Sequence, residues 1–352
     1  MFDSKEHPHK RLNILTGDWV LVSPHRMKRP WQGKVESIAT DNRPSYDPSC
    51  YLCPGNKRSD ESMNPDYKGA YAFTNDFSAL LKDTPDGEIN KHNLLLAKSE
   101  SGICRVICFS PDHSLTLPLM SEQAIENVIA LWQNEFALLS ANSFIKYIQI
   151  FENKGEVMGC SNPHPHGQIW ASSSIPLELI KETTQQKKHF ELYGKSLLSD
   201  YVVIELKEKE RIVFENEHFV ALVPFWAVWP YETLIISKRH VQYISQFSDE
   251  EKKSLACILK NLTVKYDNLF NTSFPYSAGI HQAPVNDGEH EEWHWHIHFY
   301  PPLLRSVTVK KFMVGYEMLA NPQRDISPEM AASTLQTLSA IHFKNKTAEN
   351  EA

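Results

Sequence analysis

The chain has 352 residues, of which 41% are hydrophobic, so it can fill a large core and is not expected to be disordered. It carries 36 Lys and Arg against 43 Asp and Glu, a net charge of −7. This acidic balance, without any basic run, argues against a nucleic-acid partner or an anionic membrane and favours a small-molecule substrate. No apolar run approaches the roughly 20 residues of a membrane-spanning helix, and the first residues lack the apolar segment of a signal peptide. We therefore expect a soluble, cytoplasmic protein.

Strands and helices are predicted along the whole chain. Apolar, β-branched runs predict strands at Trp19–Val22, Cys104–Phe109, Tyr147–Phe151, Phe219–Val223, Thr233–Ile236 and Trp295–Phe299. Apolar residues at helical spacing behind a capping residue predict helices after Ser121, from Pro176 to Gly194, after Ser248 and after Ser327.

The two halves of the chain repeat one pattern. His113 and His240 each precede a helix-capping serine by eight residues, and a histidine alternation follows at His164 and again at His294. The offsets agree, since 240 − 113 = 127 and 294 − 164 = 130. This repetition predicts an α+β fold made of a duplicated unit, with antiparallel sheets and helices packed on one face. We place the two halves at residues 1–195 and 196–352.

The segment His164-Pro-His166-Gly-Gln168 has the character of a site. In an extended strand, residues two apart share a face, so the three polar side chains should line one surface. The neighbouring prolines confine the segment to a sheet edge or an irregular stretch. Two surface histidines in a proline-rich loop are the alternative interpretation.

Cys50 and Cys53 have the spacing of a pair that binds one tetrahedral zinc ion. His113 and His164 can supply the other two ligands, which would make the centre closed and structural. A redox-active pair and two unliganded cysteines remain alternatives, although Pro54 directly after the motif disfavours the helix that redox pairs usually open.

The second half offers a different set of metal ligands. His296 and His298 alternate along one predicted strand, and His281 and His294 lie nearby in sequence. Imidazoles joined by a carboxylate suit zinc or ferrous iron. Glu182 could supply that carboxylate, although its spacing alone indicates a solvated residue on a helix.

Segments spread over nearly the whole chain match one known family, most specifically SNPHPHGQ, and also SPHRMKRPWQG, CYLCPGN, YAFTNDF, RVICFSPDHSLTLP, FENKGEVMG, FPYSAGIHQAP and HFYPPLLRSVTVKKFMVGYEML. In these segments the chain resembles galactose-1-phosphate uridylyltransferases, which belong to the histidine-triad-like superfamily. The resemblance implies transfer of UMP from UDP-glucose to galactose 1-phosphate, giving glucose 1-phosphate and UDP-galactose.

The resemblance also assigns residues, position by position. It implies that His166 is the nucleophile and that zinc is bound by Cys50, Cys53, His113 and His164. It implies a second metal, iron or zinc, on Glu182, His281, His296 and His298, which reverses the interpretation of Glu182 from spacing. Substrate contacts beside the nucleophile would come from Asn75, Asp76, Asn153, Gly159, Cys160, Ser161 and Gln168. In a homodimer with shared active sites, the other subunit would contribute Arg26, Arg29, Lys311, Phe312, Tyr316, Glu317 and Gln323. His294 has no role in this pattern.

Two other functions are considered. A nucleotide phosphorylase or dinucleotide hydrolase would share the scaffold and the nucleophile. A zinc-stabilised binding module would use all of its histidines structurally and would form no covalent adduct. The residue pattern alone does not identify the second metal.

Overall fold

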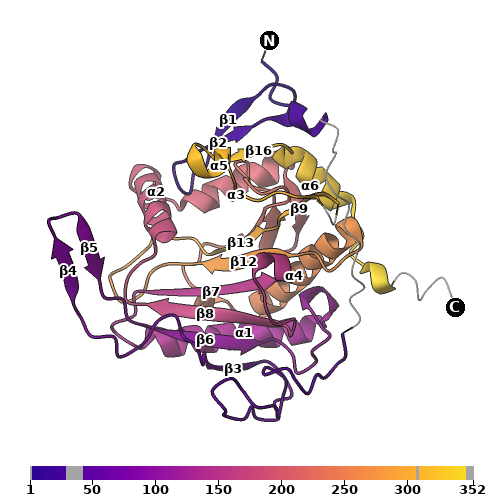
Figure 1. Cartoon of the computed structure of the whole chain (residues 1–352). Coiled ribbons are helices and arrows are strands. Elements are labelled where there is room, and N and C mark those ends of the chain that lie inside the picture. The colour runs from indigo at the N-terminus through magenta and orange to yellow at the C-terminus, as the bar shows by residue number, and fades with distance from the viewer. Residues whose placement is uncertain (1, 29–42, 307–308, 346–352) are drawn as a thin grey trace.

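The computed structural model describes residues 2–28, 43–306 and 309–345 (Figure 1). The helices are α1 (Glu122–Ser140), α2 (Leu177–Tyr193), α3 (Leu197–Glu208), α4 (Asp249–Phe270), α5 (Tyr316–Leu319) and α6 (Pro328–Thr337), with short 3-10 turns η1 (Pro24–Lys28), η2 (Leu117–Leu119), η3 (Glu156–Met158) and η4 (Ile244–Gln246). None of the described helices combines the length and the apolarity that a membrane crossing requires.

Nine strands form one antiparallel sheet across the centre of the molecule (Figure 1). In order across the sheet they are β3 (Tyr71–Thr74), β6 (Gly102–Cys108), β8 (His166–Ser172), β7 (Tyr147–Lys154), β12 (Tyr276–His281), β13 (His296–Tyr300), β11 (Thr233–Ser237), β10 (Phe219–Leu222) and β9 (Ile212–Glu215). The order β6-β8-β7 in the first half is mirrored by β12-β13-β11 in the second. The duplicated α+β unit is therefore confirmed, and the two units share one continuous sheet through the pairing of β7 with β12.

The two faces of this sheet carry different layers. The large core lies between one face and the long helices α1 and α4, where Ile169, Ile235 and Ile297 are buried. The strand residues between these positions point to the opposite face. There α3 packs on Leu234 and Ile236, and α2 lies near Tyr147. Helices α1 and α4 cover one face as expected, but the predicted helix α2 and the unpredicted helix α3 cover the other, so the helices are not confined to one face.

Helix ends follow the capping residues of the sequence. Ser121 accepts a hydrogen bond from the backbone of Ala124 and begins α1, and Ser248 forms a capping box with Glu251 at the start of α4. Gly194, with a φ of 66°, ends α2 in the left-handed conformation that favours glycine. The six predicted strands are also present, with ends shifted by at most three residues.

Smaller elements surround the central sheet. The strands β1 (His9–Leu12), β2 (Trp19–Val22) and β16 (Gln323–Arg324) form a three-stranded sheet, and β14 (Leu303–Ser306) pairs with β15 (Val309–Lys310). The hairpin of β4 (Glu88–Lys91) and β5 (Leu95–Lys98) projects from the body of the molecule (Figure 1).

Candidate active site and metal centres

His166 is the first residue of β8, and its side chain lies on the face of the sheet opposite α1 and α4. Both neighbouring prolines lie in the irregular segment before β8, so they do not interrupt the strand, which is interior to the sheet. The imidazole Nδ1 lies 2.7 Å from the carbonyl oxygen of His164. A hydrogen bond from Nδ1 to this carbonyl leaves the lone pair on Nε2. Burial lowers the pKa of His166, so the ring is neutral near pH 7.

A cavity of about 250 Å³ opens beside His166. It brings together every residue expected on the nucleophile side, namely Asn75, Asp76, Asn153, Gly159, Cys160, Ser161 and Gln168. Gln168 shares a face of β8 with His166, and its Oε1 accepts a hydrogen bond from Trp170 Nε1 at 3.1 Å. This contact orients the amide so that its nitrogen can donate to a ligand.

The four residues expected to bind zinc form a buried cluster. Their ligand atoms, on Cys50, Cys53, His113 and His164, all lie within 4.8 Å of one another. Cys53 Sγ lies 3.6 Å from Nδ1 of His113 and 3.6 Å from Nδ1 of His164. Two thiols and two imidazoles match the donor set of a closed tetrahedral zinc centre.

The surroundings of this cluster orient its ligands. His164 Nε2 lies 2.9 Å from the carbonyl oxygen of Ser110, which directs the lone pair of Nδ1 towards the cysteines. Asn162 donates to Cys50 Sγ at 3.4 Å and accepts from the backbone N–H of His164 at 2.9 Å. Burial raises the pKa of the Cys53 thiol, whereas a redox-active cysteine has a lowered pKa. The cluster therefore fits a metal better than it fits a redox pair.

A second cluster lies on the same face of the sheet, where β12 and β13 of the second half meet α2 of the first. The ligand atoms of Glu182, His281, His296 and His298 lie within 4.8 Å of one another. Nδ1 of His296 lies 2.8 Å from the carbonyl oxygen of His294, to which it donates a hydrogen bond. Nδ1 of His298 lies 2.9 Å from the hydroxyl of Tyr300. The Nε2 atoms of both rings therefore face the carboxylate, 3.4 Å and 3.5 Å away.

Glu182 shows that this cluster also fits a cation. Its Oε2 is buried without a hydrogen-bond partner among the described residues, which a metal ion would satisfy. Burial would raise the pKa of Glu182, but the imidazoles of His281 and His296 hold it well below its usual value. Burial lowers the pKa of His298 to about 3, which keeps this imidazole neutral as a ligand must be. An isolated, solvated carboxylate is excluded for Glu182, which is 2% exposed.

The residues expected to act from another subunit gather elsewhere. Arg26, Lys311, Tyr316, Glu317 and Gln323 line a cavity of about 410 Å³, which shares no lining residue with the cavity at His166. Within the chain, Lys311 pairs with Glu317, and Arg26 Nε lies 2.8 Å from Asp325. Phe312, which follows Lys311 in the chain, is 37% exposed and does not line this cavity. Arg29 lies outside the described residues.

The sequence pattern did not identify three side chains that support the site. Arg58 forms an ion pair with Asp76 and lies over the ring of Phe73, with 4.1 Å between the guanidinium carbon and the ring centre. The Tyr67 hydroxyl lies 3.1 Å from His164 Nε2, and Tyr300 supports His298. Only the alternation of Tyr300 with His298 along one strand could have indicated such a role from sequence.

Comparisons with known proteins agree with this geometry. The model of the galactose-1-phosphate uridyl transferase N-terminal domain matches residues 1–176, and that of the C-terminal domain matches residues 182–347. A galactose-1-phosphate uridylyltransferase of Haemophilus influenzae is 56% identical over 347 residues, covering 99% of each chain. One of Saccharomyces cerevisiae is 50% identical over 358 residues, covering 97% of this chain and 98% of the relative.

Solved structures share the fold over nearly the full length. A uridylyltransferase structure has a TM-score of 0.74 at 24% identity, covering 94% of this chain and 97% of the other. An ADP-glucose phosphorylase of Arabidopsis thaliana with bound ADP-glucose also has a TM-score of 0.74, at 25% identity, covering 95% and 100%. Both domain models and the full-length relatives confirm the resemblance read from the sequence. The chain therefore belongs to the galactose-1-phosphate uridylyltransferase family.

Proposed function

We propose that this protein transfers UMP from UDP-glucose to galactose 1-phosphate by double displacement through His166. The observation that carries the proposal is the neutral imidazole of His166, which one carbonyl holds beside the cavity lined by the expected substrate residues. The full-length relatives at 45–56% identity, named for this transfer, support the substrate pair.

The reaction consists of two displacements at the same phosphorus. Nε2 of His166 attacks the α-phosphorus of UDP-glucose, a P–N bond forms, and the P–O bond to the β-phosphate breaks to release glucose 1-phosphate. A phosphate oxygen of galactose 1-phosphate then attacks this phosphorus, and the P–N bond breaks to give UDP-galactose and free His166. The second step is the chemical reverse of the first, with galactose 1-phosphate in place of glucose 1-phosphate.

Protein groups stabilise the charges of these steps. The imidazole becomes positively charged while Nε2 bonds to phosphorus, and the His164 carbonyl at 2.7 Å stabilises the Nδ1 proton at that moment. Gln168 can donate to a phosphoryl oxygen, since its Oε1 is already held by Trp170. The apolar walls at Phe73 and Val106 and the polar groups of Asn75 and Asp76 suit the uridine.

We propose that zinc occupies the Cys50 cluster and that iron or zinc occupies the Glu182 cluster. Both donor sets are closed by protein side chains, so the metals would stabilise the fold and supply no chemistry to the transfer. The zinc ligand His164 lies two residues before His166 and provides the carbonyl that holds it. This link makes the nucleophile's position depend on the structural centre.

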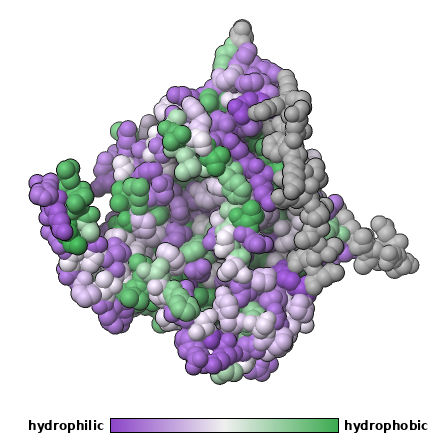
Figure 2. All heavy atoms as spheres, in the orientation of Figure 1, coloured by the Kyte–Doolittle hydropathy of each residue, from purple (hydrophilic) through white to green (hydrophobic). Residues whose placement is uncertain are grey.

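We also propose a homodimer with shared active sites. The two sets of substrate residues line separate cavities of one chain, so a second copy would complete each site. The β4–β5 hairpin exposes Ile89, Leu94, Leu95 and Leu96, each at least 56% exposed, and Figure 2 shows apolar surface on this projection. Exposed apolar residues that cluster on a projection are typical of a subunit contact. We also propose that the two repeated units correspond to residues 1–195 and 196–352.

We propose a cytoplasmic location, because the state of the cysteines fits a reducing compartment. All six cysteines of the chain are unpaired, as expected in a reducing compartment.

The test of the transfer proposal is incubation with UDP-glucose alone, followed by intact-mass measurement. We expect a mass increase of one uridylyl group, little free UMP, and exchange of labelled glucose 1-phosphate into UDP-glucose without acceptor. His166→Ala should abolish the adduct and lower transfer by several orders of magnitude, whereas His218→Ala, a partly exposed histidine at the β9–β10 turn, should leave both unchanged.

Other outcomes would point to the alternative functions. Rapid UMP release from the donor alone would indicate a hydrolase, and efficient use of inorganic phosphate as the acceptor would indicate a phosphorylase. Absence of both adduct and turnover would leave only a binding module. Parallel initial-rate lines against both substrates are expected, and intersecting lines without exchange would exclude the covalent route.

A further inference from the structure

His294 occupies the place in the second half that the zinc ligand His164 occupies in the first. His164 Nε2 lies 2.9 Å from the carbonyl of Ser110, and His294 Nε2 lies 2.8 Å from the carbonyl of Ser237, where 237 − 110 = 127. The ring centres of His113 and His164 are 5.4 Å apart, and those of their counterparts His240 and His294 are 5.3 Å apart. The second half therefore retains the histidine pair of a zinc centre.

The carbonyl of each histidine holds a ring two residues later. His166 Nδ1 lies 2.7 Å from the carbonyl of His164, and His296 Nδ1 lies 2.8 Å from the carbonyl of His294. In the first half this contact directs Nε2 of His166 into the cavity. In the second half the same contact directs Nε2 of His296 towards Glu182.

The two halves differ in the contacts of Nδ1 on the equivalent histidines His164 and His294. Nδ1 of His164 faces Cys53 Sγ at 3.6 Å, within the proposed zinc centre. Nδ1 of His294 instead lies 2.9 Å from the hydroxyl of Ser196 and 3.2 Å from that of Ser199, at the start of α3. Since Nε2 donates to the Ser237 carbonyl, Nδ1 accepts from the serines. Two hydroxyl donors thus take the place that the metal would have in the first half.

His294 also connects the elements that carry the second cluster. It is fully buried on the segment entering β13, and its backbone N–H donates to Gln186 Oε1 at 3.0 Å. Gln186 lies one helical turn after Glu182 on the same face of α2. Through these contacts His294 joins α2, α3, β11 and β13 at one point.

We propose that His294 is the positioning residue of the Glu182 metal centre. Its imidazole, held by Ser196, Ser199 and Ser237, fixes the backbone whose carbonyl sets the tautomer and ring plane of His296, while its N–H fixes the turn of α2 after Glu182. His294 does not contact the metal. This inference rests on the metal centre proposed above. It assigns a function to His294, which is not in the proposed ligand set to which His296 and His298 belong.

The test measures the affinity of the second centre for zinc by competition with a chelator, in the full-length holoprotein. His294→Ala should weaken zinc binding at this centre by about 10- to 100-fold, the usual effect of removing an outer-shell partner of a ligand. Zinc at the Cys50 centre, measured in the same titration, should bind as in the parent. A second-centre affinity within twofold of the parent would overturn the proposal.

Serine variants keep the test decisive if His294→Ala does not fold. Ser196→Ala with Ser199→Ala should weaken the second centre at least fivefold, and Ser196→Thr, which retains the hydroxyl, should bind like the parent. Ser248→Ala is the matched control, because it removes the N-cap of α4 as Ser196→Ala removes that of α3, without touching His294. Equal affinities in the double variant and the parent, or equal losses in the control, would refute the positioning role.

A separate variant tests the metal centre itself. His281→Ala removes one proposed ligand, so it should lower the combined iron and zinc content by one ion per chain. If this combined content is unchanged, the proposed second centre fails, whatever the role of His294.

Discussion

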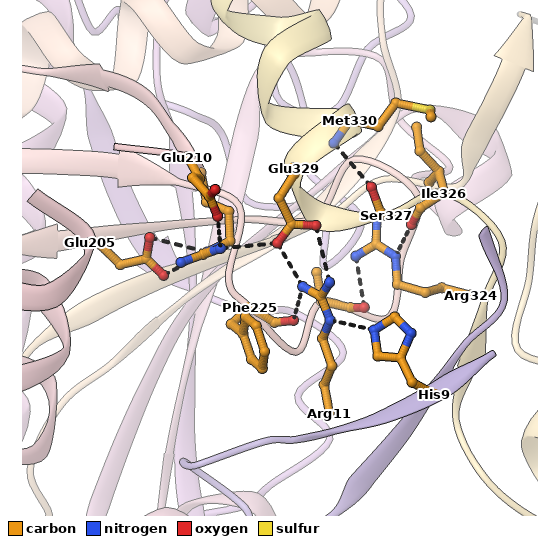
Figure 3. Close-up of polar contacts among 12 residues, drawn as sticks. His9, Arg11, Glu205, Glu210, Phe225, Arg324, Ile326, Ser327, Glu329 and Met330 are labelled. Carbon is orange, nitrogen blue, oxygen red and sulfur yellow. Dashed lines mark hydrogen bonds and ion pairs between the residues drawn. The ribbon is translucent and has the colours of Figure 1, made fainter. Parts of the chain in front are cut away.

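Glu329 provides a test of how the three-stranded sheet of β1, β2 and β16 is held to the rest of the protein (Figure 3). Its carboxylate, at the start of α6, accepts hydrogen bonds from Arg11 on β1 at 2.7 Å and 3.1 Å, and from Arg211 at 3.0 Å. The side chains of Arg11 and Arg211 are 5% and 7% exposed, and that of Glu329 is 24% exposed. Glu329→Gln keeps the shape of the side chain and removes the charge between two buried guanidinium groups.

The magnitude follows from the pKa of Glu329. Burial alone would raise this pKa, but hydrogen bonds and charge from Arg11, with Arg211, lower it from 4.5 to about 2. Lowering the pKa from 4.5 to about 2 corresponds to about 3 kcal/mol of folding free energy at pH 7. Breaking a buried ion pair by removing one partner typically costs about 3–5 kcal/mol. Glu329→Gln should therefore lower the free energy of unfolding by about 3 kcal/mol.

The pH dependence has a definite sign. Because the pKa is lowered in the folded state, the contribution of Glu329 is complete above pH 4.5 and is lost as the pH falls from 4.5 towards 2. Urea unfolding of the parent and of Glu329→Gln, measured at pH 7 and at steps down to pH 3, should show the difference shrinking in this range.

The control is Asp66→Asn, which removes an exposed carboxylate 2.6 Å from Lys68 and should not change the unfolding curve measurably. A difference between parent and Glu329→Gln below about 1 kcal/mol at pH 7, or one that does not change with pH, would refute the reasoning.

The remaining predictions concern the metals, the subunit contact and the support of the zinc ligands. Cys53→Ser should lower both the zinc content by one ion per chain and the melting temperature, because the free energy of metal binding contributes to folding; unchanged zinc in elemental analysis would contradict the ligand set. Leu95→Asp on the exposed hairpin should shift the protein from dimer towards monomer in sedimentation, while an unaltered dimer would exclude the hairpin from the contact. Tyr67→Phe should destabilise the fold by about 1 kcal/mol, since the buried hydroxyl donates to the Leu52 carbonyl at 2.5 Å and contacts His164; no change in urea unfolding would contradict this.

The helix starts were the structural feature that the sequence predicted most directly. The helix starts at Ser121, Ser248 and Ser327 were predictable because a capping hydroxyl and its apolar periodicity lie within a few neighbouring residues. α3 was not predicted, because β-branched residues of its YVVIEL segment give no clear helical period. Tertiary packing on Leu234 and Ile236 decides that segment.

Residue types along the chain also indicated the chemistry. The duplicated histidine alternation, the cysteine pair and the family motifs predicted two ligand sets and a nucleophile, and the structure brings the residues of each set together. They could not show the orientation of an imidazole, which depends on a carbonyl and a hydroxyl brought in from other segments. The contacts of the Ser110 carbonyl and the Tyr67 hydroxyl with His164 are of this kind.

The equivalent positions His164 and His294 show which properties the sequence reveals and which depend on tertiary contacts. The offset of 130 residues between His164 and His294 was visible in the chain, but the function of His294 was not. Its meaning depends on which atoms meet Nδ1: a cysteine thiol in one half, and two serine hydroxyls in the other. Those partners lie 111 residues before His164, and 98 and 95 residues before His294. Capping residues and local periodicities can be read from the sequence. Contacts between segments so far apart form only when the nine-stranded sheet has paired its strands and the helices have packed on both of its faces.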